Sequence, residues 1–223
     1  MARWRRYWPW LTGRGNTALT PQLLQDIDRG IHQYSYKGVR TLKCPFDMAL
    51  YSLMLWRDKP RTIFEIGSAS GGSALWFADQ LKTFGIDGKI HSLDINPVEV
   101  AATDTIKFYT GDVGRLAEIF PASWIGEQPR PLLVIDDGPH DYGSARTVLK
   151  HFAPLMKSGE YIVIEDGILT ALGDDKKFGL GGGPMKAVHD FIAEGAPFEI
   201  DRSYCDFFGH NATWNVDGFL RRL

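Results

Sequence analysis

The stretch Ile63-Phe64-Glu65-Ile66-Gly67-Ser68-Ala69-Ser70-Gly71-Gly72-Ser73 decides the fold of this chain. An apolar run containing one acid, Glu65, breaks into a glycine-rich turn, and a helical pattern follows over residues 73–81. Free N–H groups and the positive end of the helix dipole would face the turn. Glycines at positions 67, 71 and 72 would let a ligand come close to the backbone. The turn therefore predicts a site for an adenosine-type cofactor, although plain turns share its composition.

Around this stretch the chain alternates between strand and helix patterns. Strands are expected at 62–66, 89–93, 106–109, 131–135 and 161–164, and helices at 21–33, 45–56, 73–81, 114–120, 143–155 and 185–193. Two late strands, 198–200 and 218–220, would form an antiparallel edge. Such alternation predicts an α/β fold with a doubly wound, mostly parallel, Rossmann-like sheet and an N-terminal helical extension.

The composition of the chain argues against a nucleic-acid-binding protein and against a membrane-spanning protein. The 223 residues carry a net charge of −2, so no global basic field favours nucleic acid, and no apolar run is long enough to span a membrane. Cys44 and Cys205 match neither a zinc spacing nor a disulfide framework, which favours a reducing, cytoplasmic location. The basic, aromatic residues 1–10 suggest a lid, a membrane-surface contact, or a segment packed on the domain or on a second subunit. We favour packing on the domain or on a second subunit.

Carboxylates stand at the carboxyl ends of five expected strands, where ligands bind in doubly wound sheets. Asp94 is placed to accept hydrogen bonds from a ribose diol, and Asp112 could reach an adenine amino group. The alternative for both is a loop cap, because aspartate readily bonds nearby backbone.

A second group of acids lies after two further strands. Asp137, Glu165 and Asp166 offer hard oxygen ligands of the kind that magnesium prefers, and the alternative is helix capping with surface solvation. His140 follows Asp137 by three residues and could take a proton from a substrate hydroxyl near neutral pH. The alternative is a loop histidine that bonds to backbone.

Taken together, these motifs resemble one known family. The chain is similar to the cephalosporin hydroxylase and rhamnosyl O-methyltransferase family of class I S-adenosylmethionine (SAM)-dependent methyltransferases, to which macrolide-sugar O-methyltransferases are related. The resemblance covers roughly residues 30–223. The matching segments are Tyr36-Lys37-Gly38, Lys43-Cys44-Pro45-Phe46-Asp47, the stretch from Glu65 to Ser73, Asp136-Asp137-Gly138-Pro139-His140, the stretch from Gly159 to Gly167, and the tail from Asn215 to Arg222.

The resemblance implies roles for particular residues. Three acids would hold Mg²⁺, at Asp137, Glu165 and Asp166, and His140 would be the general base with Asp137 beside it at the catalytic centre. Some family members place the first acid immediately before the histidine, where this chain has Pro139, so Asp136 stays an alternative to Asp137. The expected cofactor-binding residues are Glu65, Gly67, Ser68, Ser70, Gly72, Ser73, Asp94, Asp112 and Asp136.

The resemblance therefore predicts a SAM- and Mg²⁺-dependent O-methyltransferase acting on a hydroxyl of a sugar or natural-product scaffold. Residues 1–58 would form an N-terminal segment and helices for lid or oligomer contacts, and residues 59–223 the methyltransferase domain. Because members of this family are often oligomers, the resemblance also implies a homo-oligomer. Acceptor recognition is expected from residues 1–40, 169–183 and 204–214, whose aromatic residues suit a core or interface equally well. Two alternatives stay open: a non-catalytic or hydroxylase-assisting cofactor-binding partner in natural-product biosynthesis, and an NAD-binding oxidoreductase, although the turn lacks the G-x-G-x-x-G spacing.

Overall fold

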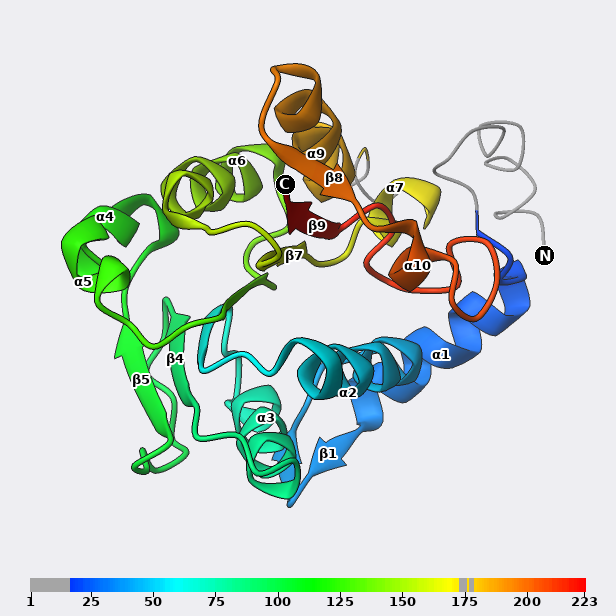
Figure 1. Cartoon of the computed structure of the whole chain (residues 1–223). Coiled ribbons are helices and arrows are strands. Elements are labelled where there is room, and N and C mark those ends of the chain that lie inside the picture. The colour runs from blue at the N-terminus through cyan, green and yellow to red at the C-terminus, as the bar shows by residue number, and fades with distance from the viewer. Residues whose placement is uncertain (1–16, 173–175, 177–178) are drawn as a thin grey trace.

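A seven-stranded sheet with helices on both faces forms the body of the molecule (Figure 1). The computed structural model describes residues 17–172, 176 and 179–223. In spatial order the strands are β5 (Ile106–Thr110), β4 (Lys89–Asp94), β3 (Thr62–Ile66), β6 (Leu132–Asp136), β7 (Tyr161–Ile164), β9 (Phe219–Arg222) and β8 (Phe198–Ile200).

The strand pairing matches the expected doubly wound sheet. The five strands β5, β4, β3, β6 and β7 are parallel to one another, whereas β9 is antiparallel to both β7 and β8. The mostly parallel sheet and its antiparallel edge are therefore confirmed. The chain runs outward from β3 through β4 to β5, and then returns to the other side of β3 to begin β6. This reversal leaves a crevice at the carboxyl ends of β3 and β6, the usual ligand position in such sheets.

One face of the sheet is covered by α2 (Pro45–Asp58) and α3 (Gly72–Thr83), with the short α10 (Arg202–Cys205) beside them (Figure 1). Helix α2 begins at Pro45, whose fixed φ suits the first helical position, and ends where Lys59 turns left-handed at φ 46°. Tyr51 of α2 packs edge-to-face on Phe77 of α3, and both are buried against β3. Both cysteines are buried free thiols, as expected.

The other face is covered by α6 (Tyr142–Phe152) and α9 (Gly183–Ala193), together with α4 (Leu116–Ile119) and α5 (Ala122–Gly126) (Figure 1). Phe64 of β3 lies at the centre of this core and contacts the rings of Phe120, Trp124 and Phe152. Two expected helices have 3-10 turns at one end: η3 (Val113–Arg115) precedes α4, and η4 (Ala153–Leu155) follows α6. Pro154 explains the second break, because proline has no N–H to continue the α-helical ladder.

The N-terminal extension packs at the rim of the sheet. Helix α1 (Pro21–Gln33) begins after Thr20, whose hydroxyl accepts a hydrogen bond from Leu23 N, and is followed by a hairpin of β1 (Ser35–Tyr36) and β2 (Val39–Arg40). The buried face of α1 joins Cys44, Trp214 and α7 (Ile168–Leu172) in a third apolar cluster. Residues 1–10 and Phe178 lie outside the described residues, and the domain boundary at residue 58 stays a prediction.

Candidate active site

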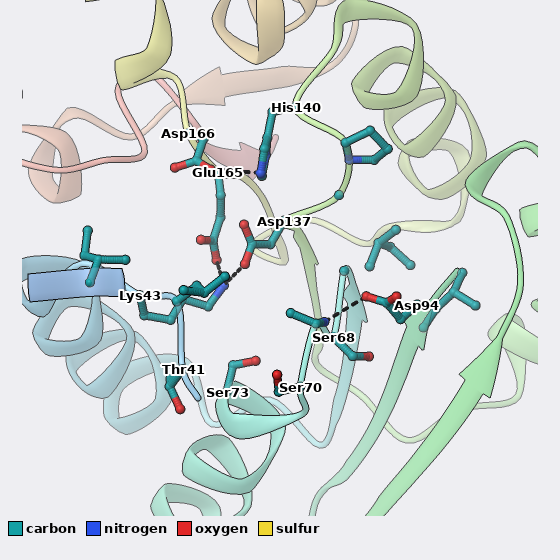
Figure 2. Close-up of a pocket in the computed structure, with 18 of the residues that line it drawn as sticks. Thr41, Lys43, Ser68, Ser70, Ser73, Asp94, Asp137, His140, Glu165 and Asp166 are labelled. Atoms are coloured by element: carbon teal, nitrogen blue, oxygen red, sulfur yellow. Dashed lines mark hydrogen bonds and ion pairs between the residues drawn. The ribbon is translucent and has the colours of Figure 1, made fainter. Parts of the chain in front are cut away.

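A cavity of about 900 Å³ lies at the carboxyl ends of the parallel strands. Ten of the thirteen residues that the sequence indicated line it: Gly67, Ser68, Ser70, Ser73, Asp94, Asp112, Asp137, His140, Glu165 and Asp166. Figure 2 shows the glycine-rich turn and Asp94 on one side of this cavity and the acids with His140 on the other. We call these two parts the cofactor end and the acid end.

The glycines of the turn lie directly against other segments of the protein. A Cβ on Gly67 would lie 2.0 Å from the carbonyl oxygen of Asp137, and a Cβ on Gly72 would lie 2.0 Å from Thr41 Oγ1. Gly67 also has a left-handed φ of 100°. These positions therefore need glycine because one protein segment touches another. The close packing leaves Ser68, Ser70 and Ser73 at the cavity wall.

Two aspartates shape the rest of the cofactor end. Asp94, the last residue of β4, accepts hydrogen bonds from Ala69 N at 2.8 Å and Asn96 N at 2.9 Å, so it ties the glycine-rich turn to the next strand. Asp112 accepts a hydrogen bond from Gly114 N at 2.7 Å. Both carboxylates therefore cap loops, as the alternative interpretation expected, while they also line the cavity.

Three of the predicted cofactor contacts lie behind the wall. Glu65, Gly72 and Asp136 are absent from the cavity lining. Glu65 is fully buried and accepts a hydrogen bond from Ser92, whose hydroxyl also lies 2.5 Å from that of Ser68. Burial raises the pKa of Glu65, and the nearby positive charge of Lys43 opposes that rise. Glu65 thus supports the turn from beneath.

The acid end brings Asp137, His140 and Asp166 together. One ligand atom from each of these residues lies within 4.8 Å of the others. His140 Nε2 is 3.2 Å from Asp166 Oδ2, and both residues have a left-handed φ of 59°. A left-handed backbone conformation raises the free energy of residues other than glycine, and residues that adopt it are found most often at functional sites. Burial lowers the pKa of His140, but the surrounding carboxylates, Asp166 foremost, raise it above its ordinary value.

Glu165 lies deeper and is held differently. Its Oε1 accepts hydrogen bonds from Tyr51 Oη at 2.6 Å and from Lys43 Nζ at 2.5 Å. Burial and the charge of Asp137 raise the pKa of Glu165 to about 7, although Lys43 opposes the rise. Asp136, the alternative metal ligand, is also buried, and burial raises its pKa to about 7. Of the two aspartates, Asp137 is the one at the cavity surface.

Lys43 is a site residue to which the sequence reasoning assigned no role. Its Nζ bridges Glu165 Oε1 and Asp137 Oδ2, the latter at 2.7 Å, and only 3% of its side chain is exposed (Figure 2). Burial lowers its pKa, but the charges of Asp137, Glu165 and Glu65 raise it further than burial lowers it. Lys43 stands in one of the segments that carry the family resemblance, and that was the available signal.

The C-terminal segment supports the acid end from behind. Asn215 Oδ1 accepts a hydrogen bond from Asp166 N at 3.3 Å. A Cβ on Gly167 would lie 2.1 Å from Val216 O, so the loop after β7 lies directly against this segment. Asp47 of α2 is buried and accepts hydrogen bonds from Thr213 Oγ1 and Trp214 N, which joins α2 to the same segment. Burial raises the pKa of Asp47 to about 8.

A further wall of the cavity comes from the N-terminal extension. Asp28, Ile31 and His32 of α1 line it, together with Leu169 and Trp214. Each segment from which acceptor recognition was expected, residues 1–40, 169–183 and 204–214, contributes residues to the cavity lining, and their part in recognition stays a prediction. Asp28 lies close enough to the acid end for its charge to raise the pKa of Asp166.

The amino-acid sequence of the chain is similar to those of known O-methyltransferases. The family model described as rhamnosyl O-methyltransferase/CmcI matches residues 29–223. A rhamnosyl O-methyltransferase of Mycobacterium leprae is 27% identical over 201 residues, which cover 84% of this chain and 82% of the relative. No helix among the described residues is long and apolar enough to cross a membrane. The expected cytoplasmic location and homo-oligomer stay predictions.

Two solved structures of cmcI align with most of the chain. A structure of cmcI with Mg-SAM is 29% identical, with a TM-score of 0.67, and the match covers 86% of this chain and 77% of that one. A structure of cmcI with SAH is also 29% identical, with a TM-score of 0.64, and the match covers 85% of this chain and 82% of that one. The identity and coverage of these two matches agree with the family match over residues 29–223.

Proposed function

The chain belongs to the rhamnosyl O-methyltransferase/CmcI family of SAM-dependent O-methyltransferases, and on this premise we propose that it methylates a hydroxyl of a small molecule with the help of Mg²⁺. The observation that carries this proposal is the shape of the cavity. A glycine-rich turn with a strand-end aspartate and an acid–histidine cluster open into one space. A methyl donor and a hydroxyl acceptor must meet in such a space.

The residues present fit both groups. Ser68, Ser70, Asp94 and Asp112 would hold SAM, because they line the cavity at the glycine-rich turn and at the ends of the neighbouring strands. Asp137, Asp166 and Glu165 would hold Mg²⁺, because they supply the hard oxygen donors that this ion prefers. When bound, the two groups would supply an electrophilic methyl and a Lewis acid that makes the acceptor hydroxyl more acidic.

His140 would remove the proton of the acceptor hydroxyl. Its ring stands at the mouth of the acid end, with 31% of the side chain exposed, so it can reach a substrate. Asp166, 3.2 Å from Nε2, would orient the ring and stabilise the imidazolium that forms. A backbone φ of 59° fixes this position at the end of a short loop. The contact between His140 and Asp166 supports the proposal that His140 is the base and Asp166 its orienting partner.

The acceptor is proposed to be a sugar or a hydroxylated natural-product scaffold. The wall formed by α1, Leu169 and Trp214 faces the acid end and combines apolar surface from Ile31 and Trp214 with the carboxylate of Asp28 and the imidazole of His32. The apolar face of a sugar ring packs on such a surface, and its hydroxyls bond to the polar groups. The relative from Mycobacterium leprae is named for a rhamnosyl acceptor, which supports this class.

The first experiment is isothermal titration calorimetry with SAM and with S-adenosylhomocysteine, each with and without Mg²⁺. Binding in the micromolar range, about −8 kcal/mol, would support the cofactor assignment and justify a screen of glycosides and hydroxylated natural products as acceptors. Absence of binding in every condition would contradict the proposal. Titration of NADH under the same conditions separates this function from the oxidoreductase alternative.

A non-catalytic cofactor-binding partner remains the second candidate. It would bind SAM with no turnover of any acceptor in the screen. The His140–Asp166 contact argues against it, because a binding module gains nothing from a base held beside acids. Replacement of His140 by alanine would leave such a module fully active, which makes the same variant the discriminating one.

A further inference from the structure

Lys43 enters the acid end from outside the sheet. It lies between β2 and α2, immediately before Cys44, which caps α2, so its backbone is held by two elements that do not carry the acids. The side chain crosses to the ends of β6 and β7 and is almost completely buried. A buried lysine of this kind is retained only where opposite charges offset the loss of hydration.

The acids around it need a cation. Asp137 and Glu165 each contact its Nζ, and Asp166, Asp136 and Glu65 are close enough to affect the charges of the cluster. Buried carboxylates at one place repel one another unless positive charge is supplied. Among the described residues of the cluster, Lys43 and His140 are the basic side chains in contact with these acids.

The same two carboxylates belong to the proposed metal set. Lys43 contacts Oδ2 of Asp137 and Oε1 of Glu165, one oxygen of each carboxylate. A divalent cation held by these carboxylates would be close to the ammonium group, and two positive charges repel strongly at the low effective dielectric of a buried site. The ammonium would therefore stabilise the acids in the metal-free protein and oppose the binding of the metal.

We propose that Lys43 is a built-in counter-cation that holds Asp137 and Glu165 in place and competes with Mg²⁺ for their negative charge. This inference rests on the proposed metal site and does not depend on methyl transfer. Lys43 lowers the affinity of the site for Mg²⁺ and raises the stability of the metal-free protein. A purely structural ion pair would contribute the same stability with and without the metal.

The test compares Lys43→Met with the wild type at about pH 8.5, where the carboxylates are more fully ionised. Calorimetric titration with Mg²⁺, without SAM or acceptor, should give a dissociation constant about tenfold lower for Lys43→Met. Its melting temperature should lie below that of the wild type in EDTA, and the difference should shrink in excess Mg²⁺.

Three further variants separate charge from packing. Lys43→Arg keeps the charge and should stay within about threefold of the wild-type metal affinity. Tyr51→Phe removes the other hydrogen bond to Glu165 Oε1 without changing charge, and should also leave that affinity within about threefold. Lys37→Met removes a surface lysine that pairs with Asp79 at 2.5 Å, away from the cavity, and should leave metal affinity unchanged.

Each remaining outcome decides the question. Equal or weaker Mg²⁺ binding by folded Lys43→Met, or an equal melting-temperature deficit with and without metal, would overturn the proposal. If Lys43→Met folds only when Mg²⁺ is present, the competition is supported in its strongest form; if Mg²⁺ cannot restore folding, the metal does not replace the ammonium and the proposal is wrong. Failure to bind SAM would contradict the proposed function alone.

Discussion

The two ends of the cavity are built in different ways. The cofactor end comes mainly from one continuous strand–turn–helix segment, and its hydrogen bonds join side chains to backbone, as Asp94 does with Ala69 N and Asn96 N. The acid end gathers side chains from three distant segments, joined by charge: Lys43 before α2, Asp137 and His140 after β6, and Asp166 after β7. The cofactor end therefore depends on local backbone shape, whereas the acid end depends on a balance of charges that no single segment contains.

The largest expected effect lies at the acid end. His140→Ala should lower kcat by about 10² to 10⁴-fold, because the base would be lost, while the dissociation constant for SAM should stay within about threefold. Steady-state kinetics with an acceptor from the screen and calorimetry with SAM measure the two quantities. His210→Ala, which removes a half-exposed histidine paired with Asp206, is the matched control. Near wild-type turnover in His140→Ala would reject the base assignment.

The next effect tests whether the cofactor end works independently. Asp94→Asn should raise the dissociation constant for SAM by about 10 to 100-fold, since a charged acceptor of hydrogen bonds is lost, while Mg²⁺ binding should not change. Calorimetry with each ligand gives the result. Asp87→Asn, at a side chain that is 85% exposed, serves as control. A parallel loss of Mg²⁺ affinity would show that the two ends are coupled after all.

A smaller effect is expected at the acceptor wall. Asp28→Ala should raise the KM for a glycoside acceptor by about tenfold with little change in kcat, because it would remove a substrate contact and no reacting group. Asp26→Ala is a matched control on the same helix, since Asp26 pairs with Arg29 and does not line the cavity. Equal KM values for the two variants would exclude α1 from acceptor recognition.

The smallest effect concerns pH and stability. Burial raises the pKa of Asp47 to about 8, so the native protein binds a proton there that the unfolded chain releases near its ordinary value of 3.8. The favourable contribution of the protonated form is therefore present at low pH and declines as pH rises between these two values, by an amount on the order of a few kcal/mol.

Chemical unfolding of the metal-free protein between about pH 5 and pH 8 measures this trend. Asp47→Asn should flatten the dependence of the unfolding free energy on pH, because the titrating group is gone. An unchanged slope would assign the trend to other buried acids of the acid end, such as Asp136 and Glu165, whose pKa values burial raises to about 7.

Much of the fold and of the site could be predicted from particular residues. The alternation of strand and helix patterns predicted the parallel sheet and its antiparallel edge, which the strand pairing confirms, and the motifs predicted the family that the comparison confirms. The small elements β1, β2, α5, α7 and α10 were not predicted, because two to five residues carry too little periodicity to separate them from loops.

Other features could not be predicted because they depend on contacts between distant segments. The sequence did not indicate that Gly67 and Gly72 lie against Asp137 and Thr41. Nor did it indicate that Glu65 is fully buried and accepts a hydrogen bond from Ser92. The roles of the individual site residues stay predictions until the variants are measured.

The sequence by itself determined the order of strands and helices, the position of the glycine-rich turn and the acids at the strand ends, because these follow from local periodicity, backbone freedom and the rule that ligands meet parallel strands at their carboxyl ends. Only the tertiary structure decided which acids lie close enough to interact electrostatically and which lie behind the lining of the cavity. It also decided that Lys43 bridges Asp137 and Glu165. Burial and Coulomb interaction depend on distances in space, and residues 43, 137 and 165 are brought together only by the folded sheet.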